Sequence, residues 1–148
     1  MLFVLSAPSG SGKTTIARGV LRHYPELRFS VSATTRPRRP RETEGKDYFF
    51  LTREEFEHRI EDGDLVEWEE IYGNLYGTLR SEIDRVLTDN GHLLFDIDVK
   101  GALSVKRLYP DDAVLVFIKP PSLDVLRRRL EQRGTDDPAI ITRRLERA

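Results

Sequence analysis

The sequence contains no cysteine among its 148 residues. Disulfide bonds and thiol chemistry are therefore excluded. It also has no run approaching the roughly 20 apolar residues of a membrane-spanning helix. The short apolar run near the N-terminus lacks both the charged flank and the length of a signal peptide. We therefore expect a cytoplasmic protein that has no membrane partner.

An excess of charge of one sign is also missing. Charged residues make up 33% of the chain, yet its net charge is only −1 at pH 7. A general nucleic-acid-binding protein would be basic overall, so no nucleic-acid partner is expected. The basic residues are nevertheless clustered locally, which favours an anionic small molecule as the ligand. The length predicts one domain.

The stretch Leu2–Thr15 carries the most specific motif. Its apolar run Leu2–Leu5 is typical of a short buried strand, and the residues from Thr14 onward are typical of a helix. Between them lies a turn rich in glycine and serine that ends in Lys13 and Thr14. This order of strand, Gly-rich turn, Lys-Thr and helix is that of a P-loop, which binds nucleotide phosphates.

Each part of this turn has a chemical task. Gly10 and Gly12 allow a tight turn whose N–H groups face inward, and the helix N-terminus adds partial positive charge. Lys13 can reach the β and γ phosphates of ATP, and the Thr14 hydroxyl can hold Mg²⁺. Ala7 stands where the pattern has its first glycine, which matters only if the backbone there needs a positive φ. The alternative is a Gly-rich turn that binds nothing. The expected ATP-binding residues of the turn are Ala7, Pro8, Ser9, Gly10, Ser11, Gly12, Lys13, Thr14 and Thr15.

Short elements are expected between the first helix, Lys13–His23, and the next buried strand. They are strands over Phe29–Ala33, Gly45–Leu51 and Leu65–Ile71, a helix from the capping box Thr52–Glu55 to about Ile60, and a helix over Leu79–Leu87 with Thr78 as its N-cap. Within the strand Leu65–Ile71, alternation places Glu67 and Glu69 on one face.

Four arginines and two prolines lie between Arg36 and Arg41. The prolines exclude a regular helix. Arginine binds phosphate with two parallel hydrogen bonds, so this loop suits a second phosphate. A solvated charged loop is the alternative. Because the loop follows a P-loop closely, a second phosphate site is favoured.

Two further apolar runs, Gly91–Asp98 and Ala113–Ile118, predict strands of a parallel sheet buried on both faces. The first run ends in Asp96 and Asp98, which lie on the same side of an extended chain. Such an acidic strand end accompanies a P-loop and serves Mg²⁺ through water. The alternative, for one of the two aspartates, is the N-cap of the following helix, Val99–Leu108.

The last segment carries arginines on helices. Ser122 is expected to cap a helix over Leu123–Arg133, whose buried stripe would be Leu123, Leu126 and Leu130. Beyond a break after Gly134, Arg144 falls on the inward face of the next segment, where an arginine needs an anion. An ordinary salt bridge is the alternative for Arg144. A third buried strand should be followed by an element that finishes the sheet, so we expect the end at Ala148 to be a truncation or to lack an unobserved tail.

Together these motifs resemble the guanylate kinase family, nucleoside monophosphate kinases that phosphorylate GMP. The resemblance spans the visible chain through Ser6–Thr14, Ser32–Glu42, Gly45–Phe50, Glu67–Trp68, Gly73–Thr78, Asp96–Asp98, Pro120–Ser122 and Arg133–Thr135. It implies an α/β P-loop NTPase fold of three layers, α/β/α, with a parallel core sheet, a small GMP-binding insertion and a helical lid. Members of the family end with a further strand and helix, and the resemblance implies that these two elements are absent from this sequence. In a single domain over 1–148, these parts would be the core at 1–30 and 91–128, the GMP-binding region at 31–90, and the lid at about 129–148.

The resemblance also implies a role for each matching residue. Arg36 and Arg39 would hold the GMP phosphate, and Tyr48 and Tyr76 would donate hydroxyls to it. The residues that would read the guanine are Ser32, Glu67, Thr78 and Asp98, with Asp96 near the base or Mg²⁺. The groups acting on the transferring phosphoryl would be Lys13, Arg39, Arg133 and Arg144, and Arg129 and Arg133 would contact ATP.

The implied reaction is in-line transfer of the ATP γ-phosphoryl group to GMP or dGMP, with Mg²⁺. The acceptor is a phosphate monoester with a second pKa of about 6, so near pH 7 it needs no general base. Two alternatives remain: a non-catalytic phosphopeptide-binding module of this family, and a P-loop kinase for another monophosphate. The intact Gly10, Gly12, Lys13 and Thr14 argue against the first, and Glu67 with Tyr76 against the second. Monomer and homodimer both remain open.

Overall fold

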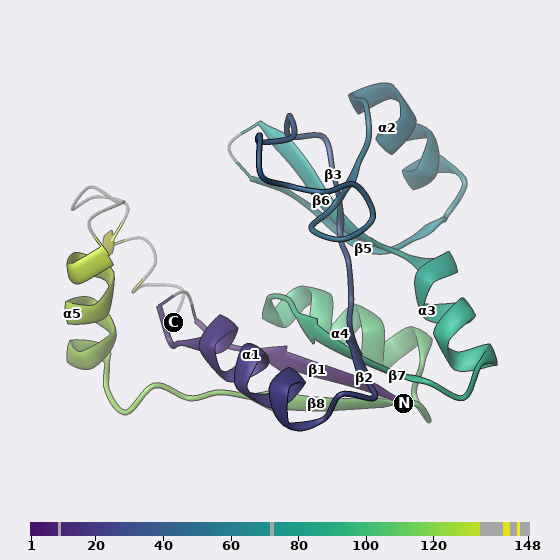
Figure 1. Ribbon diagram of the computed structural model, residues 1–148. Coiled ribbons are helices and arrows are strands. Elements are labelled where there is room, and N and C mark those ends of the chain that lie inside the picture. The colour runs from purple at the N-terminus through teal and green to yellow at the C-terminus, as the bar shows by residue number, and fades with distance from the viewer. Residues whose placement is uncertain (9, 72, 134–140, 143–144, 146–148) are drawn as a thin grey trace.

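Two four-stranded sheets organise the chain (Figure 1). The computed structural model describes residues 1–8, 10–71, 73–133, 141–142 and 145. The core sheet is parallel, in the order β2-β7-β1-β8, and the second sheet is mixed, in the order β4-β3-β6-β5. The strands are β1 Leu2–Ser6, β2 Leu27–Phe29, β3 Ala33–Thr34, β4 Phe49–Phe50, β5 Leu65–Ile71, β6 Asn74–Leu79, β7 His92–Asp96 and β8 Ala113–Phe117. The helices are α1 Lys13–His23, α2 Arg53–Glu61, α3 Arg80–Thr88, α4 Val99–Leu108 and α5 Leu123–Arg133.

Helices cover both faces of the core sheet. On one face, Val4 of β1 and Phe95 of β7 pack with Val105 of α4 in the main hydrophobic core. On the other face, Leu5 and Leu94 pack against Ala17 of α1. Neighbouring strand residues are therefore buried on opposite sides, which explains the continuous apolar runs of β1 and β7. The predicted three-layer α/β/α arrangement with a parallel core sheet is confirmed.

The second sheet has its own small core beneath α2. Phe56 of α2 is fully buried there with Ala33, Leu65 and Leu79. The register of β5 and β6 shifts between Leu65 and Glu67. Leu65 pairs with Leu79 and packs with it in the small core, whereas Glu67 pairs with Thr78, the neighbour of Leu79, so Leu65 and Glu67 face opposite sides. Val66, between them, joins the main core. The simple alternation expected for β5 therefore fails at its start, and β5 links the two cores.

Several local predictions are confirmed. The helices α1, α4 and α5 have the expected bounds. The capping box of α2 is present, since Thr52 Oγ1 accepts from the Glu55 N–H at 3.1 Å and Glu55 Oε2 accepts from the Thr52 N–H at 2.7 Å. The Ser122 hydroxyl accepts from the Val125 N–H at 3.2 Å at the start of α5. These features depend on residues close in sequence, which is why the sequence predicts them.

Two predicted strands in the first half of the chain are wrong. The stretch Phe29–Ala33 is split, because β2 ends at Phe29 in the core sheet and β3 begins at Ala33 in the second sheet. The Ser30 N–H still donates to the Leu94 carbonyl at 2.9 Å before the chain crosses over. The strand expected over Gly45–Leu51 shrinks to Phe49–Phe50, because Gly45 has a φ of 70° and opens a turn.

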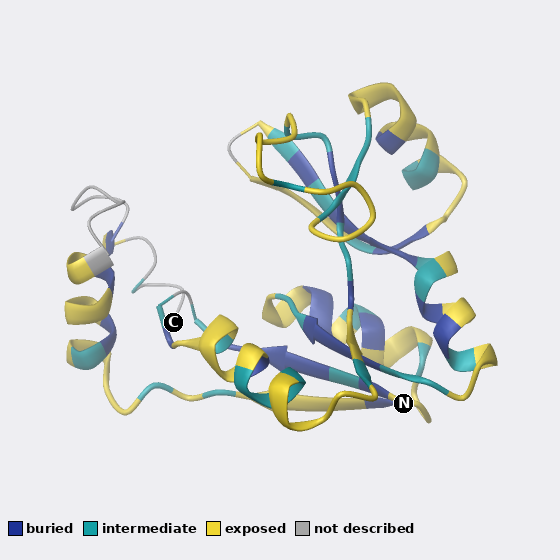
Figure 2. Cartoon of the chain, viewed as in Figure 1, coloured by how far each residue is buried: buried dark blue, intermediate teal, exposed yellow. Residues whose placement is uncertain are grey.

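The last core strand differs from its prediction in burial. The residues Val114–Phe117 of β8 are between 36% and 55% exposed, although they are all apolar. Figure 2 shows β8 as a mostly exposed strand, in contrast to the buried β1. The strand lies at the edge of the sheet with β1 beside it.

Leu123 is also 57% exposed and so falls outside the buried stripe of α5, which Leu126 and Leu130 form. Within the described part of the chain, no helix is long and apolar enough to cross a membrane.

Candidate functional site

Two cavities meet at the carboxyl ends of β1 and β7, the edge at which open α/β sheets bind ligands. The larger, of about 590 Å³, is lined by the turn after β1, the start of α1 and Arg129. The smaller, of about 350 Å³, is lined by residues of the second sheet and by Ser32. Lys13, Asp96 and Asp98 line both cavities. Two ligands bound in them would therefore meet at these three side chains.

The turn after β1 has the conformation of a phosphate-binding loop. Gly10 and Gly12 adopt φ values of 90° and 89°, a region that favours glycine. Gly12 is the N-cap of α1, so the first N–H groups of that helix face the larger cavity. Among the described residues, Asn90 is the one non-glycine with a positive φ, so Ala7 has an ordinary backbone. The methyl group of Ala7 is therefore tolerated, as the sequence predicts.

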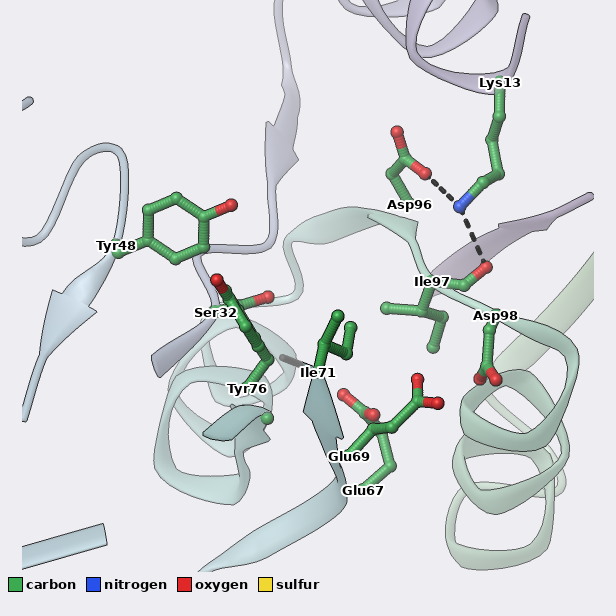
Figure 3. Close-up of a pocket in the computed structure, with 11 residues that line it drawn as sticks. Lys13, Ser32, Tyr48, Glu67, Glu69, Ile71, Tyr76, Asp96, Ile97 and Asp98 are labelled. Carbon is green, nitrogen blue, oxygen red and sulfur yellow. Dashed lines mark hydrogen bonds and ion pairs between the residues drawn. The ribbon is translucent and has the colours of Figure 1, made fainter. Parts of the chain in front are cut away.

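Asp96 contacts two side chains of the P-loop, those of Lys13 and Thr14. Its carboxylate forms an ion pair with Lys13 Nζ and accepts from Thr14 Oγ1 at 2.9 Å. Lys13 Nζ also donates to the Ile97 carbonyl at 3.1 Å (Figure 3). Thr14 and Asp96 thus bring a hydroxyl and a carboxylate oxygen together at the larger cavity.

This pair of oxygens fits Mg²⁺, which prefers oxygen ligands and takes few of them from the protein. Among the described residues, no group of three or more His, Asp or Glu side chains is arranged to hold a metal alone. A site that combines Thr14 and Asp96 with phosphate oxygens is consistent with that finding.

Helix α5 packs directly against the P-loop turn. A Cβ added at Gly10 would lie 2.9 Å from Leu130 Cδ2 and 3.3 Å from Leu126 Cδ1. Arg129, on the same helix, donates to the Ser11 carbonyl at 3.2 Å and lines the larger cavity. Of the other residues assigned to ATP or catalysis, Ser9, Arg144 and the side chain of Arg133 lie outside the described part of the chain.

Glu67 provides the acidic floor of the smaller cavity (Figure 3). Its Oε1 accepts a hydrogen bond of 2.6 Å from the Thr78 hydroxyl. Burial raises the pKa of the Glu67 carboxyl, the Thr78 hydrogen bond lowers it in part, and the nearby Asp98 charge adds to the rise. Thr78 is therefore not the expected N-cap of α3. Leu79 occupies that position, and the Thr78 hydroxyl serves Glu67 instead.

The two candidate aspartates have separate surroundings. Asp98 is the N-cap of α4, where its Oδ1 accepts from the Gly101 N–H at 2.7 Å. Asp96 instead holds Lys13 and Thr14. The N-cap alternative therefore applies to Asp98, although Asp98 also lines both cavities.

Two tyrosines form the opposite wall of the smaller cavity. Tyr48 and Tyr76 meet edge to face, with ring centroids 6.1 Å apart. Burial raises the pKa of the Tyr48 hydroxyl, and Tyr76 adds to that rise, so the Tyr48 hydroxyl remains a hydrogen-bond donor at neutral pH. The Cζ of the Arg36 guanidinium lies 5.4 Å from the centre of the Tyr48 ring. In the described part of the chain, neither Arg36 nor Arg39 lines a cavity directly.

Some residues at the site were not predicted. Glu69 and Ile71 line the smaller cavity, and strand alternation from Glu67 could have indicated both. Glu42 pairs with Arg36, and Gly101 lies beside Glu67, but no local spacing distinguishes either residue from its neighbours. The smaller cavity is lined by four of the five residues that the resemblance placed at or near the guanine: Ser32, Glu67, Asp96 and Asp98. The fifth, Thr78, does not line the cavity itself but donates a hydrogen bond to Glu67.

Comparison with known proteins decides which family combines these features. The family model described as guanylate kinase matches residues 1–148. The chain belongs to the guanylate kinase family. The predicted resemblance is thereby confirmed.

Individual guanylate kinases agree with this assignment. The chain is 58% identical over 147 residues to the guanylate kinase of Salinibacter ruber, covering 99% of this chain and 78% of that protein. It is 49% identical over 147 residues to the guanylate kinase of Thermotoga maritima, covering 99% of this chain and 70% of that protein. The crystal structure of guanylate kinase from Anaplasma phagocytophilum superposes with a TM-score of 0.69 at 38% identity. That match covers 87% of this chain and 65% of the solved chain, somewhat less than two thirds of its length.

Proposed function

We propose that this chain transfers the γ-phosphoryl group of ATP to GMP, giving ADP and GDP. The observation that carries the proposal is the pair of adjoining cavities, one with a P-loop and one with Glu67, which share Lys13, Asp96 and Asp98. A kinase needs such a junction, because the donor and acceptor phosphates must come into line. Membership of the guanylate kinase family supports the same reaction.

The larger cavity would hold ATP. The P-loop N–H groups and the α1 N-terminus would bind its phosphates, and Lys13 would neutralise the β and γ phosphates. Mg²⁺, when bound through Thr14 and Asp96, would supply charge stabilisation to the transferring phosphoryl group. Arg129 would hold the nucleotide from the α5 side. The roles of Arg39, Arg133 and Arg144 on the phosphoryl group remain predictions.

The smaller cavity would hold GMP or dGMP. Guanine presents two adjacent donors, N1–H and the 2-amino group, and the ionised Glu67 carboxylate can accept both. Adenine has an acceptor at N1 and would leave that buried charge unpaired, which sites of this type reject by about 10⁴-fold. The phosphate end would lie towards Tyr48 and Tyr76, with Arg36 beside the Tyr48 ring. The GMP phosphate is already deprotonated near neutral pH, so no protein base acts in the transfer.

A coupled assay of ADP release tests the proposal. The chain is given ATP and Mg²⁺ with each of GMP, dGMP, AMP, CMP and UMP in turn, and Lys13→Met serves as the inactive control. We expect turnover with GMP and dGMP far above that with the other acceptors. Turnover equal for all acceptors would favour a kinase for another monophosphate. GMP binding by wild-type protein without any ADP release would favour a binding module of the same family.

The division into core 1–30 and 91–128, GMP-binding region 31–90 and lid 129–148 stays a prediction, as do the cytoplasmic location and the oligomeric state.

A further inference from the structure

We propose that Glu42 is a positioning residue for the acceptor phosphate, acting through Arg36 and the Arg39 backbone. The inference rests on the proposed function, because it assumes that this loop serves the GMP phosphate. Glu42 Oε1 accepts from Arg36 Nη2 at 2.7 Å, and its other oxygen, Oε2, accepts from the Arg39 N–H at 2.8 Å. One carboxylate thus contacts two of the four arginines of the loop, Arg36 through its side chain and Arg39 through its backbone.

The second contact closes the loop on itself. The Glu42 N–H donates to the Arg39 carbonyl at 3.1 Å, so these two residues bond in both directions. The start of the loop is fixed separately, since the Arg36 N–H donates to Thr34 Oγ1 at 3.1 Å and Thr34 is fully buried. The loop, with its two prolines and four arginines, is therefore anchored at its start by Thr34 and closed by the contacts of Glu42.

The guanidinium of Arg36 is restrained on several sides. Its Nη1 donates to the Pro37 carbonyl at 2.8 Å, and its Cζ lies 5.4 Å from the Tyr48 ring centre and 5.9 Å from that of Phe50. An arginine has five N–H donors, and Glu42 and Pro37 occupy two of them. These contacts fix the orientation of the guanidinium and leave its other donors for further partners, and Tyr48, which it contacts, lines the smaller cavity.

Electrostatics keep this pair ionised. The Arg36 hydrogen bond, with the Arg39 N–H second, lowers the pKa of the Glu42 carboxyl. The same hydrogen bond raises the pKa of Arg36. A guanidinium that is already fixed loses less side-chain entropy when it binds a phosphate than a freely rotating one. Glu42 therefore contributes to GMP affinity without touching GMP.

The central variant is Glu42→Gln. An amide accepts with one oxygen only, so the variant can satisfy Arg36 or the Arg39 N–H but not both. We expect the KM for GMP to rise about tenfold, the size of one lost hydrogen bond to a charged group. The KM for ATP should stay within about twofold, because the P-loop is unchanged. The kcat at saturating GMP should change less than the KM for GMP, because the variant leaves the Arg39 side chain in place.

A matched control comes from the same segment. Glu44 Oε2 accepts from the Phe50 N–H at 3.1 Å, so Glu44→Gln removes a carboxylate that also binds a backbone amide. Among the described contacts of Glu44, none is to an arginine, so its KM for GMP should remain at the wild-type value. Glu42→Asp keeps two acceptor oxygens and should retain more GMP affinity than Glu42→Gln.

Binding of guanosine separates positioning from general damage. Guanosine has the base and ribose but no phosphate, so Glu42→Gln should weaken GMP binding and leave guanosine binding within about twofold. In a double-mutant cycle, Glu42→Gln should add little to Arg36→Ala, because both changes remove the same clamp. Thermal unfolding of each variant checks that it is folded.

The outcomes that overturn the inference are distinct from those that overturn the function. Unchanged GMP binding in Glu42→Gln, an equal loss for guanosine and GMP, or additive effects with Arg36→Ala would each refute the positioning role. A lower KM for GMP would show that Glu42 competes with the phosphate and would refute it as well. If the wild-type protein binds no GMP, the proposed function fails, and the inference fails with it.

Discussion

The hydroxyl of Thr78 donates a hydrogen bond of 2.6 Å to Oε1 of Glu67, across neighbouring strands of the second sheet. Thr78 is almost fully buried, so this bond is protected from water. A Cβ built on Gly101 would lie 3.2 Å from the second carboxylate oxygen, Oε2, so helix α4 bounds Glu67 on that side. The carboxylate is thereby fixed in one orientation at the floor of the smaller cavity.

Replacing Glu67 by Gln should reduce kcat/KM for GMP by about 10²-fold or more, because an amide cannot accept both guanine donors. The KM for ATP should stay within about twofold, since the P-loop is unchanged. The coupled assay with GMP and AMP measures the loss of base preference.

Glu70→Gln provides the matched control for this variant. Glu70 lies on the same strand but on the other face, where it is 3.6 Å from Arg53 in an exposed ion pair. Its removal should leave the preference for GMP over AMP unchanged. A Glu67→Gln enzyme that kept its full preference for GMP would contradict the assignment of Glu67 to the base.

Base recognition should also depend on pH. Burial raises the pKa of Glu67 above its ordinary value of 4.5, so a proton returns to it at a higher pH than to an exposed glutamate. The protonated group cannot accept two hydrogen bonds from guanine. We expect guanosine affinity, measured by calorimetry between about pH 5 and pH 8, to fall as the pH is lowered. Guanosine is used because the GMP phosphate itself titrates near about pH 6.

The Glu67→Gln variant isolates this titration and should bind guanosine weakly with little dependence on pH. The unfolding free energy depends on pH in the opposite direction from guanosine affinity. The folded state holds the Glu67 proton more tightly than the unfolded chain, so the unfolding free energy of the wild type relative to Glu67→Gln should fall as the pH rises above 4.5. A wild-type guanosine affinity that is flat over the whole range would contradict the role of an ionised Glu67.

Features that depend on neighbouring residues could be predicted from the sequence. The P-loop turn and the Thr52 capping box are short motifs whose spacing determines their geometry. Features that depend on distant partners could not. Thr78 has the side chain of an N-cap, but its hydroxyl bonds to Glu67, 11 residues earlier in the chain. Phe29–Ala33 has the alternation of one strand, but its two ends belong to different sheets.

The burial of β8 shows the same limit. Apolar composition predicts a covered strand, but coverage depends on which elements pack against it, and the sequence of a strand does not contain that information. At the site, sequence patterns alone predicted two phosphate sites and an acidic strand end, whereas the role of each residue toward guanine came from the resemblance. The pairing of Arg36 with Glu42 required the structure, because Glu42, Glu44 and Asp47 all follow the loop closely and the sequence does not say which of them Arg36 contacts.

Gly101→Ala should impair GMP recognition without affecting ATP. The added methyl group would lie 3.2 Å from both Glu67 Oε2 and Asp98 Oδ1, so the two carboxylates must move apart. We expect the KM for GMP to rise about tenfold or more, because a site built from hydrogen bonds loses affinity when its acceptors shift. The KM for ATP should stay within about twofold.

Gly19→Ala is the control for Gly101→Ala. Gly19 also lies within a helix, and no described atom lies within 4 Å of a Cβ built there. Alanine is the better helix former by about 1 kcal/mol, so this variant should be more stable and have an unchanged KM for GMP. An unchanged KM in Gly101→Ala as well would show that the space beside Glu67 is not needed for base recognition.

A pair of glycine variants tests the packing of α5 on the P-loop. Gly10 and Gly12 have nearly the same φ, 90° and 89°, so alanine at either position costs about 1–2 kcal/mol of backbone strain. A methyl group at Gly10 would also lie 2.9 Å from Leu130 Cδ2, whereas no described atom lies within 4 Å of one at Gly12. Overpacking of this kind typically costs about 1–3 kcal/mol more. Urea denaturation followed by circular dichroism should therefore show a larger loss of unfolding free energy for Gly10→Ala than for Gly12→Ala.

The double variant Gly10→Ala with Leu130→Ala separates the two contributions. Leu130→Ala alone should be destabilising, because Leu130 is fully buried. In combination, the shortened side chain makes room for the new methyl group, so the losses should add to less than their sum. Equal losses for Gly10→Ala and Gly12→Ala, or strict additivity with Leu130→Ala, would mean that α5 does not rest on the turn in solution. Sub-additive losses would instead place the helix that carries Arg129 directly on the phosphate-binding turn, where that arginine can reach ATP.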